Sequence, residues 1–244
     1  MALKSPKLYL RQACVNDLTK KLTPGKFLEI GAGIGIMTTM FLEKGFHGFC
    51  QDISPESINF LKINLQNFTD YIRIIDNFSG LSNENFDYLL AFEVLEHIDD
   101  DLNSLIEWSA FLKKGGYLIA SVPAHKKKFS IADKNVGHVR RYEKSELYRL
   151  LKNAGYSNIK IVNYGFPITE LSRIIGSWML TKDNALATLS NQEKNLASSY
   201  SSTPIIRRYL ALLDEKLYIP FKYIQRWFYS IDIGDGFVVV AQKQ

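Results

Sequence analysis

The sequence has little that would place it outside the cell or across a membrane. Among 244 residues there are two cysteines, Cys14 and Cys50, and both fall in apolar patterns typical of buried, reduced thiols. No apolar run approaches the ~20 residues that a membrane-spanning helix needs. Residues 1–7 lead into an amphipathic stretch, which predicts no secretory signal. We therefore expect a cytoplasmic protein.

The sequence also lacks internal repeats, low-complexity tracts and a strong charge of one sign. Its formal net charge of +5 is compatible with an anionic substrate or RNA, but it requires neither. Hydrophobic residues make up 46% of the chain and charged residues 23%, as in globular proteins. A chain of this length holds one α/β domain with a full core and an insertion.

Strand and helix patterns alternate from about residue 27 onward, which predicts a doubly wound parallel sheet. Strands are expected near 27–31, 47–52, 71–75, 86–92, 116–122, 158–164 and 236–242. Helices are expected near 8–21, 35–44, 55–66, 101–113 and 143–154. Ser54 is the predicted N-cap of a helix that starts at Pro55, and Gly115-Gly116 predicts the end of another helix.

Residues 165–235 separate the last two predicted strands. They carry helical patterns near 168–180 and 204–231, in which aromatic side chains alternate with Lys and Arg. One interpretation is a helical cap packed on the sheet edge; the other is a substrate lid or a surface that contacts lipid through 204–231. We expect a core of residues 1–164 and 236–244 and a helical insertion, 165–235, that caps the substrate.

Three alternate glycines, Gly31, Gly33 and Gly35, open the turn that follows the first predicted strand. A turn without Cβ atoms lets the backbone approach a bound ligand closely. The dinucleotide fingerprint needs its third glycine where this chain has Ile36. The pattern therefore indicates a ligand-binding turn but not a good NAD loop.

Polar groups follow the next predicted strands at the edge where open parallel sheets bind ligands. Asp52 ends the second strand, roughly twenty residues beyond the glycines, where a carboxylate can accept both hydroxyls of a ribose. Asp76 and Asn77 end the third strand, where an acidic side chain can accept an adenine amino group. The backbone at Phe92 ends the fourth strand and would lie beneath the rest of the ligand.

The run from Glu29 to Gly35, with Asp52, Asp76 and residues 86–97, resembles class I S-adenosylmethionine-dependent methyltransferases. The resemblance implies a Rossmann-like, seven-stranded α/β sheet, here with a helical insertion between strands 6 and 7. Lys114 departs from the pattern, because the family more often has proline there. The resemblance also implies S-adenosylmethionine (SAM) binding by Glu29, Gly31, Ala32, Gly33, Asp52, Ile53, Asp76, Asn77 and Phe92.

Four residues beyond the fourth strand suggest where the methyl acceptor binds. Glu93, Glu96 and His97 are spaced i, i+3 and i+4 and would share one face of a helix, and His138 follows later. This set resembles the metal site of small-RNA 2′-O-methyltransferases, and ubiquinone-pathway O-methyltransferases carry a similar Glu-His run. It implies a divalent cation of the Mg or Mn class held by all four. The alternative is a metal-free site with His97 as general base.

Arg140, Arg141 and Tyr142 follow His138 and are predicted to contact an anionic part of the substrate. The predicted function is methyl transfer to a hydroxyl of a small or medium metabolite, with His97 and His138 as the catalytic residues. Alternatives are 2′-O-methylation of RNA, metal-free N- or O-methylation, and an inactive methyltransferase fold that serves as a binding partner. The oligomeric state is left open.

Overall fold

One seven-stranded sheet lies at the centre of the computed structural model, which describes residues 5–81, 85–170 and 218–244. The strand order is β3-β2-β1-β4-β5-β7-β6, and β7 is antiparallel to both neighbours. The strands are β1 Lys26–Ile30, β2 His47–Gln51, β3 Ile72–Ile75, β4 Phe86–Phe92, β5 Leu112–Pro123, β6 Tyr156–Tyr164 and β7 Gly236–Lys243. The predicted Rossmann-like α/β fold is confirmed.

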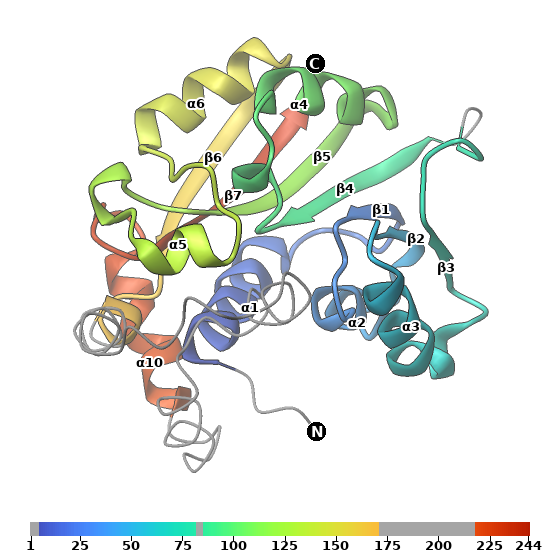
Figure 1. Ribbon diagram of the computed structural model, residues 1–244, viewed down its shortest axis with the longest axis horizontal. Helices are drawn as coiled ribbons and strands as arrows, with labels where there is room; N and C mark the ends of the chain where they lie inside the picture. Colours follow the sequence, from blue (N-terminus) through green and yellow to red (C-terminus); the bar gives the residue numbers. More distant parts are fainter. Residues whose placement is uncertain (1–4, 82–84, 171–217) are drawn as a thin grey trace.

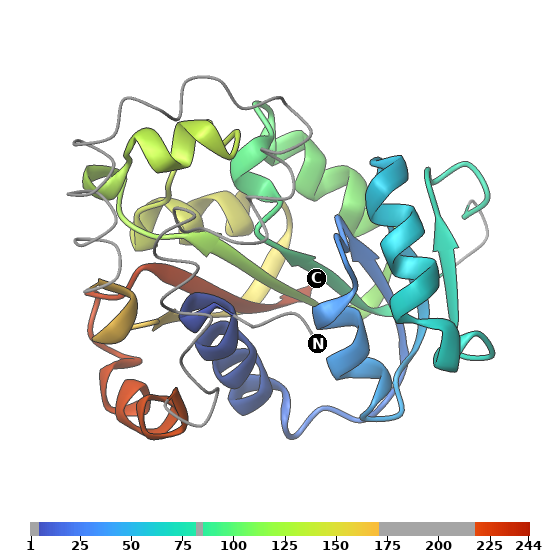
Figure 2. The same cartoon turned by 60° about the horizontal axis from the view of Figure 1, so that its bottom comes forward.

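Helices cover both faces of this sheet (Figure 1, Figure 2). On one face, α4 Asp101–Ala110 and α6 Lys144–Asn153 bury Leu105, Trp108, Leu147 and Leu151. On the other face, α1 Pro6–Thr19, α2 Ile36–Leu42 and α3 Pro55–Asn64 bury Leu10, Phe41 and Leu61. Because both faces are covered, the central strands β1 and β4 are buried at nearly every position rather than at alternate ones.

The switch in strand order lies between β1 and β4. From β1 the chain builds outward through β2 to β3, and it then returns to place β4 on the other side of β1. Ligands of open α/β sheets bind beyond the carboxyl ends of the strands at such a point. The glycine turn after β1 and the residues after β4 therefore lie at the same edge.

Local signals set several element boundaries. Ser54 caps α3 as predicted, since its Oγ accepts a hydrogen bond from the backbone N–H of Ser57 at 3.3 Å. The predicted helix through 113, ending at Gly115-Gly116, is wrong: α4 ends at Ala110 and β5 already begins at Leu112. Leu112 is buried and pairs with Phe86 across an irregular register, and this pairing extends the strand.

The end of the predicted insertion is helical in part. Short α10, Ile219–Ile224, leads into a 3₁₀ turn, Gln225–Phe228, so the predicted helix does not reach residue 231. Residues 171–217, which include most of the two predicted insertion helices, lie outside the described residues. Within the described parts, no helix is both long and apolar enough to span a bilayer.

Candidate active site

The glycine turn between β1 and α2 leaves the backbone open at one point. Gly31, Gly33 and Gly35 all have positive φ angles, of 64°, 57° and 81°, a region that side chains with a Cβ rarely adopt. A Cβ on Gly31 would lie 2.6 Å from Val94, but a Cβ on Gly33 would meet nothing within 4 Å. The backbone at Gly33 is thus bare on its outer side, where a ligand could approach it.

Asp52 connects this turn to the end of β2. Its Oδ2 accepts a hydrogen bond from the N–H of Gly33 at 2.8 Å, and its Oδ1 accepts one from the N–H of Ser54 at 3.0 Å. The next residue, Ile53, is 85% exposed although it is large and apolar. The structure therefore brings a carboxylate, a bare backbone turn and an exposed apolar side chain together.

The other residues predicted to bind the cofactor differ in how exposed they are at this edge of the sheet. Glu29 is buried under the turn and accepts a hydrogen bond from the Thr38 hydroxyl at 2.6 Å, and burial raises the pKa of Glu29 to about 8. Asp76 is exposed and accepts a hydrogen bond from the Asn77 amide at 2.7 Å. The Phe92 ring is buried and stacks on Phe41.

Glu93 does not share a helical face with Glu96 and His97, so that prediction is wrong. Only a single 3₁₀ turn, Leu95–His97, follows β4, and Glu93 precedes it with φ 58°. Its carboxylate lies 2.8 Å from Lys7 Nζ and 3.4 Å from Arg11 Nη1, two residues of α1. Burial alone would raise the pKa of Glu93, but these two charges outweigh burial and hold it well below its usual range.

Glu96 is fully buried, and neither carboxylate oxygen has a hydrogen-bond partner among the described residues. Burial, followed by the nearby charge of Glu93, raises the pKa of Glu96 well above its usual range. A buried polar side chain without a partner is unusual and marks a strained site or one built for a bound ion or ligand.

Two histidines lie beside this carboxylate. His138 Nε2 is 3.7 Å from Glu96 Oε1, and the His97 and His138 rings meet edge to face with centroids 4.8 Å apart. One ligand atom from each of Glu96, His97 and His138 lies within 4.8 Å of the others. The structure thus brings together three of the four predicted metal ligands, while Glu93 is bound to α1.

The three predicted substrate residues have structural partners instead. Arg140 donates to Asp101 at 2.9 Å, and the Tyr142 hydroxyl donates to the same carboxylate at 2.8 Å. Arg141 is 6% exposed and forms ion pairs with Asp133 and Asp235. Because these groups are occupied within the protein, we do not carry them forward as substrate contacts.

Three residues at this site were not predicted. Lys7 and Arg11 lie one helical turn apart on α1 and reach Glu93, and Asp133 pairs with His138 at 3.0 Å. The i, i+4 spacing of Lys7 and Arg11 in an otherwise apolar stretch is a weak signal that could have pointed to them. No local sequence pattern predicts that α1 packs against the end of β4.

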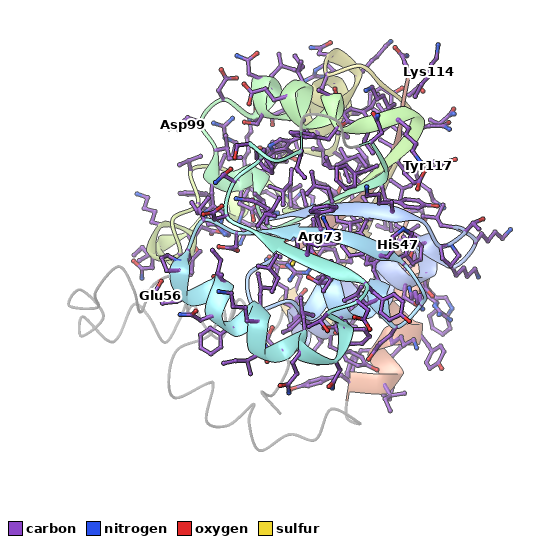
Figure 3. The ribbon with its side chains drawn as sticks, turned by 90° about the vertical axis from the view of Figure 1, so that its right-hand side faces the viewer. His47, Glu56, Arg73, Asp99, Lys114 and Tyr117 are labelled. Carbon is purple, nitrogen blue, oxygen red and sulfur yellow. The ribbon has the colours of Figure 1, made fainter. Side chains whose placement is uncertain are left out.

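The other two histidines lie apart from the cluster. His47 starts β2 and lies with Lys114 and Tyr117 toward one end of the sheet, whereas Asp99, beyond β4, lies toward the opposite end (Figure 3). His125 is 4% exposed and lies between the carboxylates of Glu143 and Asp232. Neither histidine belongs to the Glu96 cluster.

Known proteins resemble this chain in sequence and in fold. Ubiquinone biosynthesis O-methyltransferase of Cereibacter sphaeroides is 27% identical over 53% of this chain and 59% of its own. The enzyme of the same name from Vibrio atlanticus is 24% identical over 68% of this chain and 77% of its own. The chain therefore spans about three fifths of the first relative's length.

A solved structure of a SAM-dependent methyltransferase from Archaeoglobus fulgidus superposes on 98% of this chain and 95% of its own. Its TM-score is 0.60 at 15% identity, a likeness that shows the fold. A family model described as a methyltransferase domain matches residues 7–161, which include the glycine turn, Glu96 and His138. The chain belongs to this methyltransferase domain family.

Proposed function

We propose that this protein transfers a methyl group from SAM to a hydroxyl of a small or medium acceptor, with a divalent cation at Glu96, His97 and His138. The observation that carries the proposal is the pairing of the bare Gly33 turn with a buried, unpartnered carboxylate beyond the neighbouring strand β4. The first feature fits a nucleoside cofactor, and the second fits a site of proton removal.

The adenosine half of SAM would lie along the ends of β1, β2 and β3. Asp52 still has lone pairs on both oxygens after its two backbone hydrogen bonds and would accept the ribose hydroxyls. Ile53, exposed in the free chain, would cover one face of the adenine. Asp76 and Asn77 would bond the adenine amino group at the adjacent strand end.

The methionine half would extend toward β4, where Arg11 supplies positive charge. Arg11 acts electrostatically on both Glu29 and Glu93, and its buried Nε has no hydrogen-bond partner among the described residues. A buried guanidinium with an unused N–H is well suited to a carboxylate. We assign Arg11 to the cofactor's carboxylate.

The donor set of the Glu96 cluster fits a divalent cation. Two imidazoles and one carboxylate suit the first-row divalent metals, and a cation would satisfy the two orphaned oxygens of Glu96. When bound, it would lower the pKa of an acceptor hydroxyl and fix the oxygen in place. Glu93 would take part only indirectly, by holding Lys7 and Arg11 of α1 over the site.

The chain's own residues would align the acceptor and take its proton. Methyl transfer from a sulfonium is an in-line displacement, so holding the acceptor oxygen opposite the leaving sulfur is a large part of the catalysis. Burial, followed by the neighbouring His138, lowers the pKa of His97, so that its imidazole is neutral at pH 7. A neutral imidazole can accept a proton, which supports His97 as the base in a second, metal-free version of the same reaction.

The described end of the predicted cap supports an enclosed acceptor site. Gln225 donates to the Leu10 carbonyl at 3.1 Å, and Arg226 and Tyr229 both bond Asp17. These contacts join the segment after α10 to α1, the helix that carries Lys7 and Arg11. We propose that this segment and α1 together cover the acceptor side.

The names of the relatives favour oxygen over nitrogen as the acceptor atom, since both enzymes are called O-methyltransferases. The first test is calorimetric titration of the chain with SAM, followed by transfer of a labelled methyl group to a simple catechol with and without a strong chelator. We expect one SAM site and chelator-sensitive transfer. No binding at millimolar SAM would refute the proposal, and full transfer with chelator would refute only the cation.

A further inference from the structure

The segment that contains α5, Ile131–Asn135, touches both histidines of the Glu96 cluster. His138 Nδ1 lies 3.0 Å from Asp133 Oδ1, and His97 Nδ1 lies 3.1 Å from the backbone carbonyl oxygen of Gly137. Each ring therefore uses its Nδ1 on this one segment. The two contacts are separated by only four positions of the chain.

The chemistry of the partners decides which ring nitrogens carry protons. A carbonyl oxygen can only accept a hydrogen bond, so His97 must donate from Nδ1 to Gly137. Asp133 already accepts from the N–H and the hydroxyl of Ser130 and from Arg141 Nε, and this environment of donors favours an ionised, purely accepting carboxylate. His138 must then also donate from Nδ1. In the neutral form of each ring, Nε2 is then the nitrogen that carries the lone pair.

We propose that Asp133 is a positioning residue of the acceptor site, which fixes His138 as the Nδ1–H tautomer and aims its Nε2 at Glu96. The distance of 3.7 Å from His138 Nε2 to Glu96 Oε1 matches that orientation. Histidines that hold metals usually donate their other N–H to a carboxylate or a carbonyl, and loss of that partner costs affinity. The role of His138 as a metal ligand rests on the proposed function, whereas its tautomer does not.

Asp133 is itself held by a chain of ion pairs that reaches β7. Arg141 lies 2.8 Å from Asp133 with its Nε and 3.0 Å from Asp235 with its Nη1, and the same Nη1 donates to the Ala124 carbonyl at 3.1 Å. Asp133, Arg141 and Asp235 are all nearly fully buried. A buried carboxylate that is held by several hydrogen bonds has little freedom to rotate. Asp133 can therefore hold the imidazole of His138 in one orientation.

The test compares Asp133→Asn with a matched control, Asp101→Asn. Asp101 bonds Arg140 and Tyr142 of the same stretch of chain but has no hydrogen bond to His97 or His138. Its variant therefore shows the effect of weakening the packing of this stretch without removing a histidine contact. Two readouts are taken without SAM or acceptor: Mn²⁺ affinity by electron paramagnetic resonance, and the tautomers of ¹⁵N-labelled histidines by long-range ¹H–¹⁵N spectra.

In the wild type we expect Nδ1–H spectra for both His97 and His138. Asp133→Asn should disturb the His138 spectrum only and weaken Mn²⁺ binding by about 10–100-fold. Asp101→Asn should leave both readouts at their wild-type values. If Asp133→Asn does not fold, Arg141→Lys replaces it. A lysine has no planar fork with which to hold Asp133, and a weaker but similar loss of Mn²⁺ affinity is expected.

The inference is overturned if wild-type His138 carries its proton on Nε2. It is also overturned if Asp133→Asn, or Arg141→Lys where that variant replaces it, binds Mn²⁺ as tightly as Asp101→Asn does. A wild-type chain without Mn²⁺ affinity would refute the cation in the proposed function. The histidine tautomer would still decide the role of Asp133 in that case.

Discussion

The proposed cofactor edge, with Gly33 and Asp52, and the proposed acceptor side, around Glu96, are built in different ways. At the cofactor edge, Gly33 and Asp52 act through backbone turns that directly follow β1 and β2, and they bond each other at 2.8 Å. On the proposed acceptor side, Glu93 forms an ion pair with Lys7 of α1, and His138 contacts Asp133 of α5. Arg141 in turn links Asp133 to Asp235, the residue before β7. The first region is local in sequence, and the second is assembled from distant segments.

The acceptor side holds two carboxyl groups whose pKa values are shifted in opposite directions, because their charged neighbours differ. Glu93 and Glu96 are three residues apart, and Glu93 is half-buried whereas Glu96 is fully buried. Glu93 faces Lys7 and Arg11, but Glu96 has no hydrogen-bonding partner in the described chain. The pKa of Glu93 is lowered and the pKa of Glu96 is raised. One carboxylate anchors a helix, and the other is available for a ligand.

The largest expected effect comes from breaking the acceptor side alone. Glu96→Gln keeps the size of the side chain but removes the carboxylate, so we expect turnover to fall by about 10²–10⁴-fold, the range for loss of a proton-transfer group. SAM affinity by calorimetry should stay at the wild-type value, since Glu96 lies outside the glycine turn. Turnover near the wild-type rate would remove Glu96 from the reaction.

Asp52→Ala breaks the cofactor edge alone. It removes the acceptor of the Gly33 and Ser54 N–H groups and the proposed ribose ligand, and hydrogen bonds to charged groups contribute about 1.5–3 kcal/mol each. We expect SAM binding to weaken by about 10–100-fold. The Mn²⁺ affinity of this variant serves as the control and should not change. Equal loss of both affinities would show that the two regions are not separable.

At the cofactor edge, the buried carboxyl group of Glu29 makes the stability of the folded chain depend on pH. Its pKa in the folded chain is about 8, above its ordinary value of 4.5, because burial disfavours the charged form. The folded chain therefore binds this proton more tightly than the unfolded chain, and the free energy of unfolding falls as the pH rises between these two values.

Glu29→Gln keeps an oxygen that can accept from Thr38 and removes this dependence. Relative to the wild type, the variant should gain roughly 3–4 kcal/mol between pH 5 and pH 8, measured by urea denaturation at both pH values. A constant difference between the two proteins would show that Glu29 does not titrate in this window.

The smallest expected effect concerns the attachment of α1. Asp17→Asn weakens the partly exposed ion pair with Arg226 and the hydrogen bond from Tyr229, so we expect a loss of about 1 kcal/mol. Thermal denaturation of Asp17→Asn, Arg226→Gln and the double variant would isolate the pair. If the two single losses simply add, the pair does not couple α1 to the segment after α10.

Particular residues show how much the sequence could predict. The alternation of strand and helix patterns, the Ser54 cap and the glycine turn are local signals, and the structure agrees with each of them. The face that Glu93 was expected to share with Glu96 was wrong, because one 3₁₀ turn replaces the helix. Lys7 could not be placed, since its contact with Glu93 joins segments 86 positions apart that only the tertiary fold brings together. Asp133 lies only 5 positions before His138, but the short helix α5 that carries it was not predicted.

Arg141 shows that residue type alone does not predict the partners of a side chain. An arginine in a loop near a histidine indicates anion binding by residue type alone, but its partners proved to be two carboxylates of the protein itself. Residue type predicts the chemistry of a side chain, whereas burial and neighbours decide whether that chemistry is available to a ligand.

The position of the cofactor methyl relative to the Glu96 cluster can be measured with SAM labelled with ¹³C in its methyl group, bound to the protein together with Mn²⁺. If the cofactor lies on the Gly33 turn with its methyl beside the Glu96 cluster, the bound Mn²⁺ will strongly broaden the methyl resonance, and Glu96→Gln will abolish the broadening while SAM still binds. A methyl resonance that stays sharp with both ligands bound would contradict the account.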